Sequence, residues 1–261
     1  MRLGFVGTGS ITCALVEGLC TAEKPPARIL VSPRNPEKAA GLAARFLQVE
    51  VAPDNQAVVD GTDCVFLAVL PQIASGVLRE IRFRSDQTVV SLIALTPIDQ
   101  VRRLVAPARD VARAVPLPPV ARHLGPILLY PENPVVFELF GRTGKPIAVA
   151  NEEHLNVLWA LTALIAPFYA LIEEATRWAA RAGVDRQIAG PYTASMFHAL
   201  SVLATEVSDG DFSELLAGAT TPGGLNEQAL AEIRRLGGYE AFLNALNSVI
   251  VRLGEPRLER Q

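Results

Sequence analysis

The chain has 261 residues, of which 50% are hydrophobic, and it carries a formal net charge of −3 at pH 7. This length predicts one large domain or two ordinary ones, and the hydrophobic fraction suffices for a buried core. The acidic balance and the absence of a basic run argue against nucleic acid and anionic membranes as partners.

Signals for secretion and membrane insertion are weak. The N-terminus turns glycine-rich after about four apolar residues, fewer than the roughly 7–15 of a secretory signal core. The longest apolar stretch, residues 158–172, contains Thr162 and Pro167 and falls short of the roughly 20 residues of a bilayer span. We therefore expect a cytoplasmic protein in which residues 158–172 form a buried helix.

The three cysteines are Cys13, Cys20 and Cys64. They form no C-x-x-C motif and no His/Cys cluster with the spacing of metal ligands. Free buried cysteines behave as small apolar side chains. We expect all three to be reduced packing residues, and we expect no metal site.

The N-terminal segment predicts a nucleotide-binding βαβ unit. An apolar strand over residues 3–6 leads into a glycine turn and a helix, and a second strand follows over 28–32. Gly7 permits the tight turn, Gly9 lets the backbone approach a phosphate, and Ser10 and Ile11 begin a helix whose free N–H groups attract anions. The third position of the G-x-G-x-x-G pattern is Thr12, so a glycine turn in another kind of α/β protein remains an alternative.

Strand and helix patterns alternate through residue 150. This alternation predicts a doubly wound sheet with ligands beyond the carboxyl ends of its strands, and we expect a Rossmann-like domain over residues 1–150. The expected strands are 48–51, 64–70, 88–94, 111–115, 126–130 and 146–150, and the expected helices are 36–46, 55–60, 73–80 and 98–104.

After residue 150 the strand patterns stop. The expected helices are 151–164, 167–182, 186–207, 212–217, 222–236 and 239–253. They predict an all-helical domain over residues 151–254, followed by a disordered tail over 255–261. The helix over 186–207 carries more apolar side chains than one packed face requires, which predicts a dimer interface made of these helices.

The end of the second strand indicates which nucleotide the protein prefers. Enzymes that use NAD usually place Asp or Glu there, whereas this chain has Ser32, Arg34 and Asn35. These side chains suit a 2′-phosphate, and no acid repels one, so we predict NADP(H). The alternative is that Arg34 is an ordinary solvated loop residue.

Five segments together resemble the pyrroline-5-carboxylate reductase family: GFVGTGSIT at 4–12, SPRNPEK at 32–38, VLPQ at 69–72, RAVP at 113–116 and TTPGG at 220–224. The resemblance implies a Rossmann domain followed by a helical dimerisation domain, with NADPH reducing a small cyclic imine. It also implies that Ala68, Leu70 and Pro71 contact the cofactor.

The substrate site is expected around the TTPGG segment. Thr221 and the N–H groups of Gly223 and Gly224, at a helix start, can seat a substrate carboxylate; the alternative is a plain helix cap. In the family a threonine follows two residues after the second glycine, and Asn226 stands in that place. Its amide can orient the imine but cannot act as an acid at neutral pH. Asp209 is a second candidate, able to stabilise an iminium, although it also fits an ordinary turn.

Other departures from the family pattern make the expected pocket more apolar and larger. Leu70 replaces a lysine, Leu95 a glycine, and Leu117 an asparagine. Imine reduction as a class therefore follows more firmly than proline synthesis. Two alternatives stay open: a β-hydroxyacid dehydrogenase, although the chain lacks that class's helix-borne lysine, and a non-catalytic NADP-binding sensor or scaffold.

Overall fold

A computed structural model describes residues 1–257 of the chain. By internal contacts the chain divides into two compact units, Met1–Trp159 and Ala160–Gln261. The division falls within helix α7 (Glu152–Leu161), whereas the predicted boundary at residue 150 lies just after the last strand. Part of the predicted tail, residues 258–261, lies outside the described residues.

The N-terminal unit contains one eight-stranded sheet of order β3-β2-β1-β4-β5-β6-β7-β8. Neighbouring strands are parallel except β6 and β7. Strand order reverses between β1 and β4, which creates the switch point where such sheets bind ligands. The strands are β1 (Arg2–Val6), β2 (Arg28–Val31), β3 (Val49–Val51), β4 (Cys64–Leu67), β5 (Thr88–Ser91), β6 (Asp110–Val115), β7 (Pro126–Tyr130) and β8 (Lys145–Ala148).

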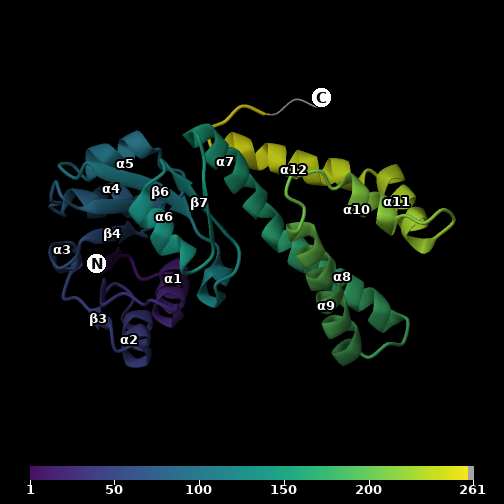
Figure 1. Cartoon of the computed structure of the whole chain (residues 1–261), viewed down its shortest axis with the longest axis horizontal. Coiled ribbons are helices and arrows are strands. Elements are labelled where there is room, and N and C mark those ends of the chain that lie inside the picture. Colours follow the sequence, from purple (N-terminus) through teal and green to yellow (C-terminus); the bar gives the residue numbers. More distant parts are fainter. Residues whose placement is uncertain (258–261) are drawn as a thin grey trace. The chain divides into compact units, whose positions relative to one another are not determined.

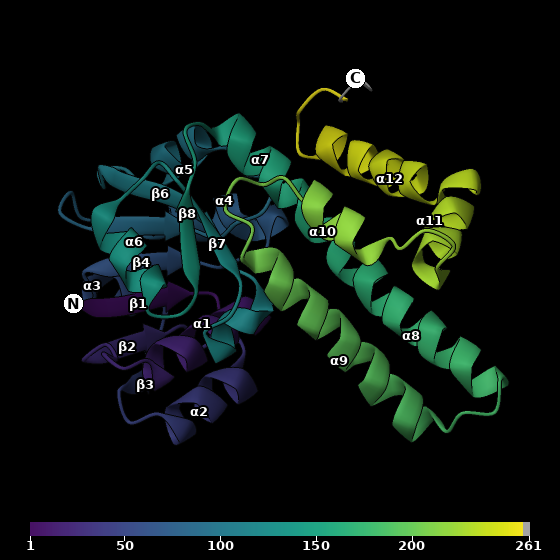
Figure 2. The ribbon, with the colours of Figure 1, turned by 45° about the vertical axis from the view of Figure 1, so that its right-hand side comes forward.

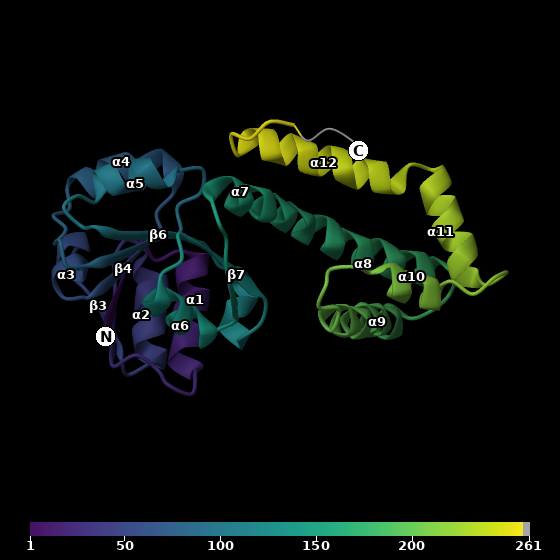
Figure 3. The ribbon, with the colours of Figure 1, turned by 45° about the horizontal axis from the view of Figure 1, so that its top comes forward.

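Helices cover both faces of this sheet, as Figure 3 shows. On one face lie α1 (Ser10–Thr21), α2 (Pro36–Arg45), η1 (Pro118–Arg122) and α6 (Pro134–Gly141); on the other lie α3 (Asn55–Asp60), α4 (Pro71–Arg79) and α5 (Ile98–Leu104). Central strands β1 and β4 are therefore buried on both sides, which explains their continuous apolar runs. Their register pairs Phe5 with Phe66, whose rings stack at 4.7 Å between centroids.

Several sequence predictions for this unit need correction. The strand expected over 64–70 ends at Leu67, because its partner β1 ends at Val6, whose carbonyl accepts the Ala68 N–H at 2.8 Å. The strand expected over 88–94 likewise ends early, at Ser91. Helix α6 was not predicted, although its start is well marked: Asn133 accepts the Val136 N–H at 3.0 Å and Pro134 follows the cap.

The burial of the cysteines agrees with a packing role. All three are free thiols, and Cys64 is buried in the sheet. Burial raises the pKa of the Cys64 thiol to about 12 and that of Cys20 to about 11. Thiols with such pKa values are poor nucleophiles at neutral pH.

Within its described residues, the second unit contains helices joined by turns and no strand (Figure 1). It contains the end of α7, η2 (Thr162–Leu164), α8 (Ile165–Arg181), α9 (Arg186–Thr205), α10 (Ser213–Ala219), α11 (Leu225–Arg235) and α12 (Gly238–Arg252). The prediction of a sheet domain followed by an all-helical domain is thus confirmed.

Helices α8 and α9 lie side by side as an antiparallel pair (Figure 2). Small side chains permit the close approach: Thr176, Ala189 and Thr193 are buried between them. Asp185 starts α9 by accepting the Gln187 N–H at 2.7 Å. Arg186 pairs with Glu173 across the two helices at 3.0 Å.

The helical segment Glu152–Arg181 is long and apolar enough to cross a membrane by length and composition, and 11% of its most apolar window is buried. The helices expected over 151–164 and 167–182 are present, but the expectation that residues 158–172 are buried is not met within this single chain. Pro167 lies in the first turn of α8, where a missing N–H does not break a helix, so the segment continues. Phe168 and Tyr169 are 41% and 62% exposed.

The second unit buries little apolar surface within this chain. Among its described hydrophobic residues, Ala160, Ala189 and Ile250 are buried. By contrast α9 alone exposes Ile188, Tyr192, Met196, Leu200, Val202 and Leu203. Exposed apolar surface on this scale marks an interaction face.

Candidate functional site

The glycine turn after β1 is fixed by the crowding of strand β4. Gly7 has φ +102°, and a Cβ atom there would lie 2.5 Å from the carbonyl oxygen of Ala68. Any other residue at this position would therefore clash with the backbone. A Cβ at Gly9 would meet nothing within 4 Å, so this side of the turn is open to a ligand.

Ser32 stabilises the glycine turn from the protein interior. Its side chain is fully buried, and its hydroxyl accepts the Gly7 N–H at 2.9 Å. Thr8, also buried, donates its hydroxyl to the Ser32 carbonyl at 2.6 Å. The predicted direct contact of Ser32 with a phosphate is therefore not supported, because the hydroxyl faces the protein interior and positions the loop.

Thr12 replaces the third glycine without loss of the turn. It is buried and donates its hydroxyl to the Gly7 carbonyl at 2.7 Å. The close packing that a third glycine often provides occurs later in α1, at Gly18. A Cβ at Gly18 would lie 2.3 Å from the Val120 carbonyl oxygen.

A cleft of about 350 Å³ lies at the carboxyl ends of β1, β2 and β4. Its position at the switch point is the one expected for a nucleotide. Of the predicted cofactor residues, the cleft is lined by Gly7, Gly9, Ser10, Arg34, Asn35, Ala68 and Leu70. The predicted residues Ile11, Ser32 and Pro71 do not line it. Four further residues that are not among the predicted cofactor contacts do line it: Thr8, Lys38, Val69 and Ile73.

Two cations face this cleft. The exposed Arg34 side chain forms no hydrogen bond or ion pair with another residue of the described range 1–257. Lys38 extends toward α1, where its Nζ donates to Ser10 Oγ at 3.1 Å. Lys38 also lies in the first turn of α2, where a cation opposes the helix dipole unless an anion is bound nearby. Asn35 caps that helix by accepting the Lys38 N–H at 3.3 Å.

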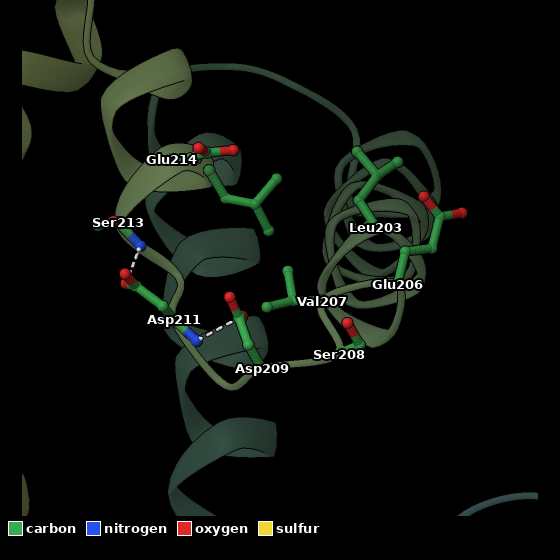
Figure 4. A pocket seen from close by; sticks show the side chains of 9 residues that line it. Leu203, Glu206, Val207, Ser208, Asp209, Asp211, Ser213 and Glu214 are labelled. Carbon is green, nitrogen blue, oxygen red and sulfur yellow. Dashed lines mark hydrogen bonds between the residues drawn. The ribbon is translucent and has the colours of Figure 1, made fainter.

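A second cavity, of about 410 Å³, lies in the helical unit between the end of α9 and the start of α10 (Figure 4). Four carboxylates line it, those of Glu206, Asp209, Asp211 and Glu214. None of the described residues that line it is basic. Asp209 accepts the Asp211 N–H at 3.0 Å, and Asp211 accepts the Ser213 N–H at 2.9 Å. These last contacts with Ser213 lower the pKa of Asp211. Asp209 thus both forms the turn and lines a cavity that favours a cation.

The TTPGG segment forms a tight turn before α11. Gly223 has φ +72°, and the Gly224 N–H donates to the Thr221 carbonyl at 2.8 Å. The Gly223 N–H donates to the carboxylate of Glu227 at 2.7 Å. The helix expected from 222 begins instead at Leu225, because Pro222 and the glycines belong to this turn.

Asn226 joins two helices of the unit. Its Nδ2 donates to the carbonyl oxygen of Ala219, the last residue of α10, at 3.0 Å. Thr221, Gly223, Gly224 and Asn226 are not among the residues lining the cavity that contains Asp209. Within this single chain, the predicted substrate residues therefore form a turn and a cavity rather than one enclosed site.

Comparisons with known proteins cover nearly the whole chain. A family model described as NADP oxidoreductase, coenzyme F420-dependent, matches residues 2–95, and one described as pyrroline-5-carboxylate reductase dimerisation matches residues 152–255. Pyrroline-5-carboxylate reductase of Pseudomonas aeruginosa is 26% identical over 97% of this chain and 96% of its own length. The Escherichia coli (strain K12) reductase is 28% identical, with 94% of each chain covered. The chain belongs to the pyrroline-5-carboxylate reductase family.

Solved structures of this reductase family share the fold. The Plasmodium falciparum pyrroline carboxylate reductase, with NADP bound, has a TM-score of 0.83 at 19% identity and covers 97% of each chain. The Streptococcus pyogenes reductase has a TM-score of 0.82 at 21% identity, covering 97% of this chain and 98% of its own. The family resemblance drawn from the motifs is confirmed, and it takes precedence over the β-hydroxyacid dehydrogenase alternative.

Proposed function

We propose that this protein uses NADPH to reduce the C=N bond of a cyclic imine, with pyrroline-5-carboxylate as substrate and proline as product. Membership of the reductase family is the observation that carries this proposal. The cofactor supplies a hydride to the imine carbon, and the ring nitrogen gains a proton from water or enters already protonated. Secondary amine and NADP⁺ result.

The cleft of the N-terminal unit fits NADP(H). The Gly7–Ser10 turn offers backbone N–H groups to the pyrophosphate, and Arg34 and Lys38 offer two cations to the 2′-phosphate. No acidic residue of the described chain lines this cleft, so nothing there selects a free ribose hydroxyl pair.

The helical unit supplies the substrate groups in this proposal. Thr221, Gly223 and Gly224 bind the substrate at the start of α11, and Asn226 orients the imine through its amide. Asp209 stabilises the positive charge that develops on the ring nitrogen. The carboxylates of the surrounding cavity favour the same charge.

A homodimer, located in the cytoplasm, completes the proposal. The matched dimerisation region covers residues 152–255, the part of the chain that buries few apolar side chains by itself. A partner copy gives the exposed face of α9 and the apolar 152–181 segment a protein surface to cover them. Sedimentation tests this: a stable and fully active monomer would overturn it.

The decisive experiment combines the purified protein with NADPH and a panel of cyclic imines, pyrroline-5-carboxylate first. We expect NADPH oxidation in one-to-one proportion to proline detected by mass spectrometry. Tight NADPH binding without turnover on any imine would overturn the enzyme assignment and favour the sensor alternative.

A further inference from the structure

The N–H group expected to hold the substrate carboxylate already holds a carboxylate from this chain. Glu227 lies in the first turn of α11, and its Oε2 accepts the Gly223 N–H at 2.7 Å. The side chain is exposed, and no arginine or lysine among residues 1–257 forms an ion pair with it. The positive end of α11 and this N–H therefore provide the local compensation for its charge.

The contact with the Glu227 side chain shows that this turn can bind a carboxylate. Gly223 adopts φ +72°, which aims its N–H toward the first turn of the helix, and glycine leaves room for an anion to approach. The neighbouring Gly224 N–H is used by the Thr221 carbonyl. Of the two glycine N–H groups, that of Gly223 is thus the one open to a carboxylate, and Glu227 occupies it.

We infer that Glu227 is a specificity-determining residue that competes with the carboxylate of the substrate for the start of α11. This inference rests on the proposed imine reduction. A substrate carboxylate must displace the Glu227 side chain and then remain near its charge, and both steps raise KM. A cyclic imine without a carboxylate, such as 1-pyrroline, does not meet this competition.

The plain alternative is a capping-box contact, in which the third residue of a helix stabilises its start and does nothing else. Three variants separate the two roles. Glu227→Gln keeps an oxygen that accepts the Gly223 N–H but loses the charge, and Glu227→Ala loses both. Glu232→Gln is the matched control, because Glu232 lies on the same helix and pairs there with Arg235.

The experiment measures kcat and KM for pyrroline-5-carboxylate and for 1-pyrroline with NADPH. We expect Glu227→Gln and Glu227→Ala to lower KM for pyrroline-5-carboxylate by about ten-fold, the size of one charge-assisted hydrogen bond. KM for 1-pyrroline and both values for Glu232→Gln should stay within about two-fold.

The outcomes are distinguishable. Equal changes for both imines, or none in Glu227→Gln, would show that Glu227 is only a helix cap and would overturn the inference while imine reduction stands. If neither imine is reduced by the parent protein, the proposed function itself fails.

Discussion

Arg113 and Glu152 form an ion pair in which the arginine side chain is 4% exposed and the glutamate 24%. The same carboxylate accepts the Ile98 N–H at 2.7 Å, and the guanidinium lies 5.5 Å from the centre of the Trp159 ring. One carboxylate therefore ties strand β6 to the starts of α5 and α7. Arg113 belongs to a family motif, yet its contacts here are structural.

Removing either charge should destabilise the N-terminal unit strongly. Glu152→Gln keeps an acceptor for the Ile98 N–H but leaves a buried guanidinium without its counter-charge, which typically costs about 3–5 kcal/mol. Urea denaturation followed by fluorescence measures this loss. The neighbouring exposed Glu153→Gln is the control and should change stability by less than about 0.5 kcal/mol. Equal losses in the two variants would contradict the structural role.

The sequence predicts most elements of the fold because their signals are local. The helix over 55–60 and the strand over 126–130 agree with the structure to the residue, since Asp54 caps the first and apolar residues fill the second. Helix α6 is not predicted, because its short apolar run is equally typical of a strand. Asn133 and Pro134 are nevertheless local signals for its start.

The site was less predictable from the sequence, because the orientation of a side chain and the partner that it contacts depend on the folded structure. The residue type of Ser32 suits a phosphate, but only the packing of β1 against β2 shows that its hydroxyl points inward to Gly7. Lys38 is not among the predicted cofactor contacts, although a lysine in the first turn of a helix opposes the helix dipole and is a signal for a nearby anion. The sequence also gives no signal for the role of Glu227, because its proposed effect on substrate binding depends on which backbone N–H its carboxylate accepts.

Arg34 should determine the preference for NADPH over NADH. Arg34→Ala removes a cation that has no other partner among the described residues, so NADPH affinity should fall by about ten- to a hundred-fold. NADH affinity should change little, because NADH lacks the 2′-phosphate. Titration calorimetry with both cofactors measures the effect. Arg45→Ala, whose arginine pairs with Glu17 outside the cleft, serves as control, and equal losses for both cofactors would remove the assignment.

Leu95 should be replaceable by glycine with a gain in stability. It has φ +57°, a left-handed conformation that costs a side-chain-bearing residue roughly 1–2 kcal/mol, and it is 44% exposed. Leu95→Gly removes this strain at the expense of chain entropy, for a net gain of about 0.5–1 kcal/mol. Leu47→Gly, at an exposed residue without positive φ, should give no gain in the same thermal unfolding assay.

Asp63 should contribute stability only above acidic pH. Hydrogen bonds from the Arg2 side chain and backbone lower the pKa of Asp63 to about 2. Because this lies below the unfolded pKa of about 3.9, its contribution is complete above pH 4 and disappears as pH falls toward 2. Asp63→Asn should therefore cost at most about 1 kcal/mol at pH 7 and nothing near pH 2, since the pair is exposed. A pH-independent loss in urea titrations would contradict this.

Asn226 should orient the imine rather than donate a proton, because its amide does not ionise near neutrality. One N–H of that amide is committed to the Ala219 carbonyl, which fixes the side chain and leaves the rest of the amide to contact a substrate. Asn226→Thr restores the residue found elsewhere in the family, so activity toward pyrroline-5-carboxylate should persist or rise. Asn226→Leu removes the polar contact and should slow hydride transfer by about ten- to several-hundred-fold.

Stopped-flow absorbance of NADPH isolates that step from product release. The lost contact with Ala219 also affects folding, so thermal unfolding of Asn226→Leu must be measured beside Gln228→Leu, a change at an exposed position of the same helix. A slow but stable Asn226→Leu protein supports the orienting role. If that variant transfers hydride as fast as the parent, Asn226 only joins α10 to α11, and the group that acts on the imine must be sought at Asp209, in the acidic cavity after α9.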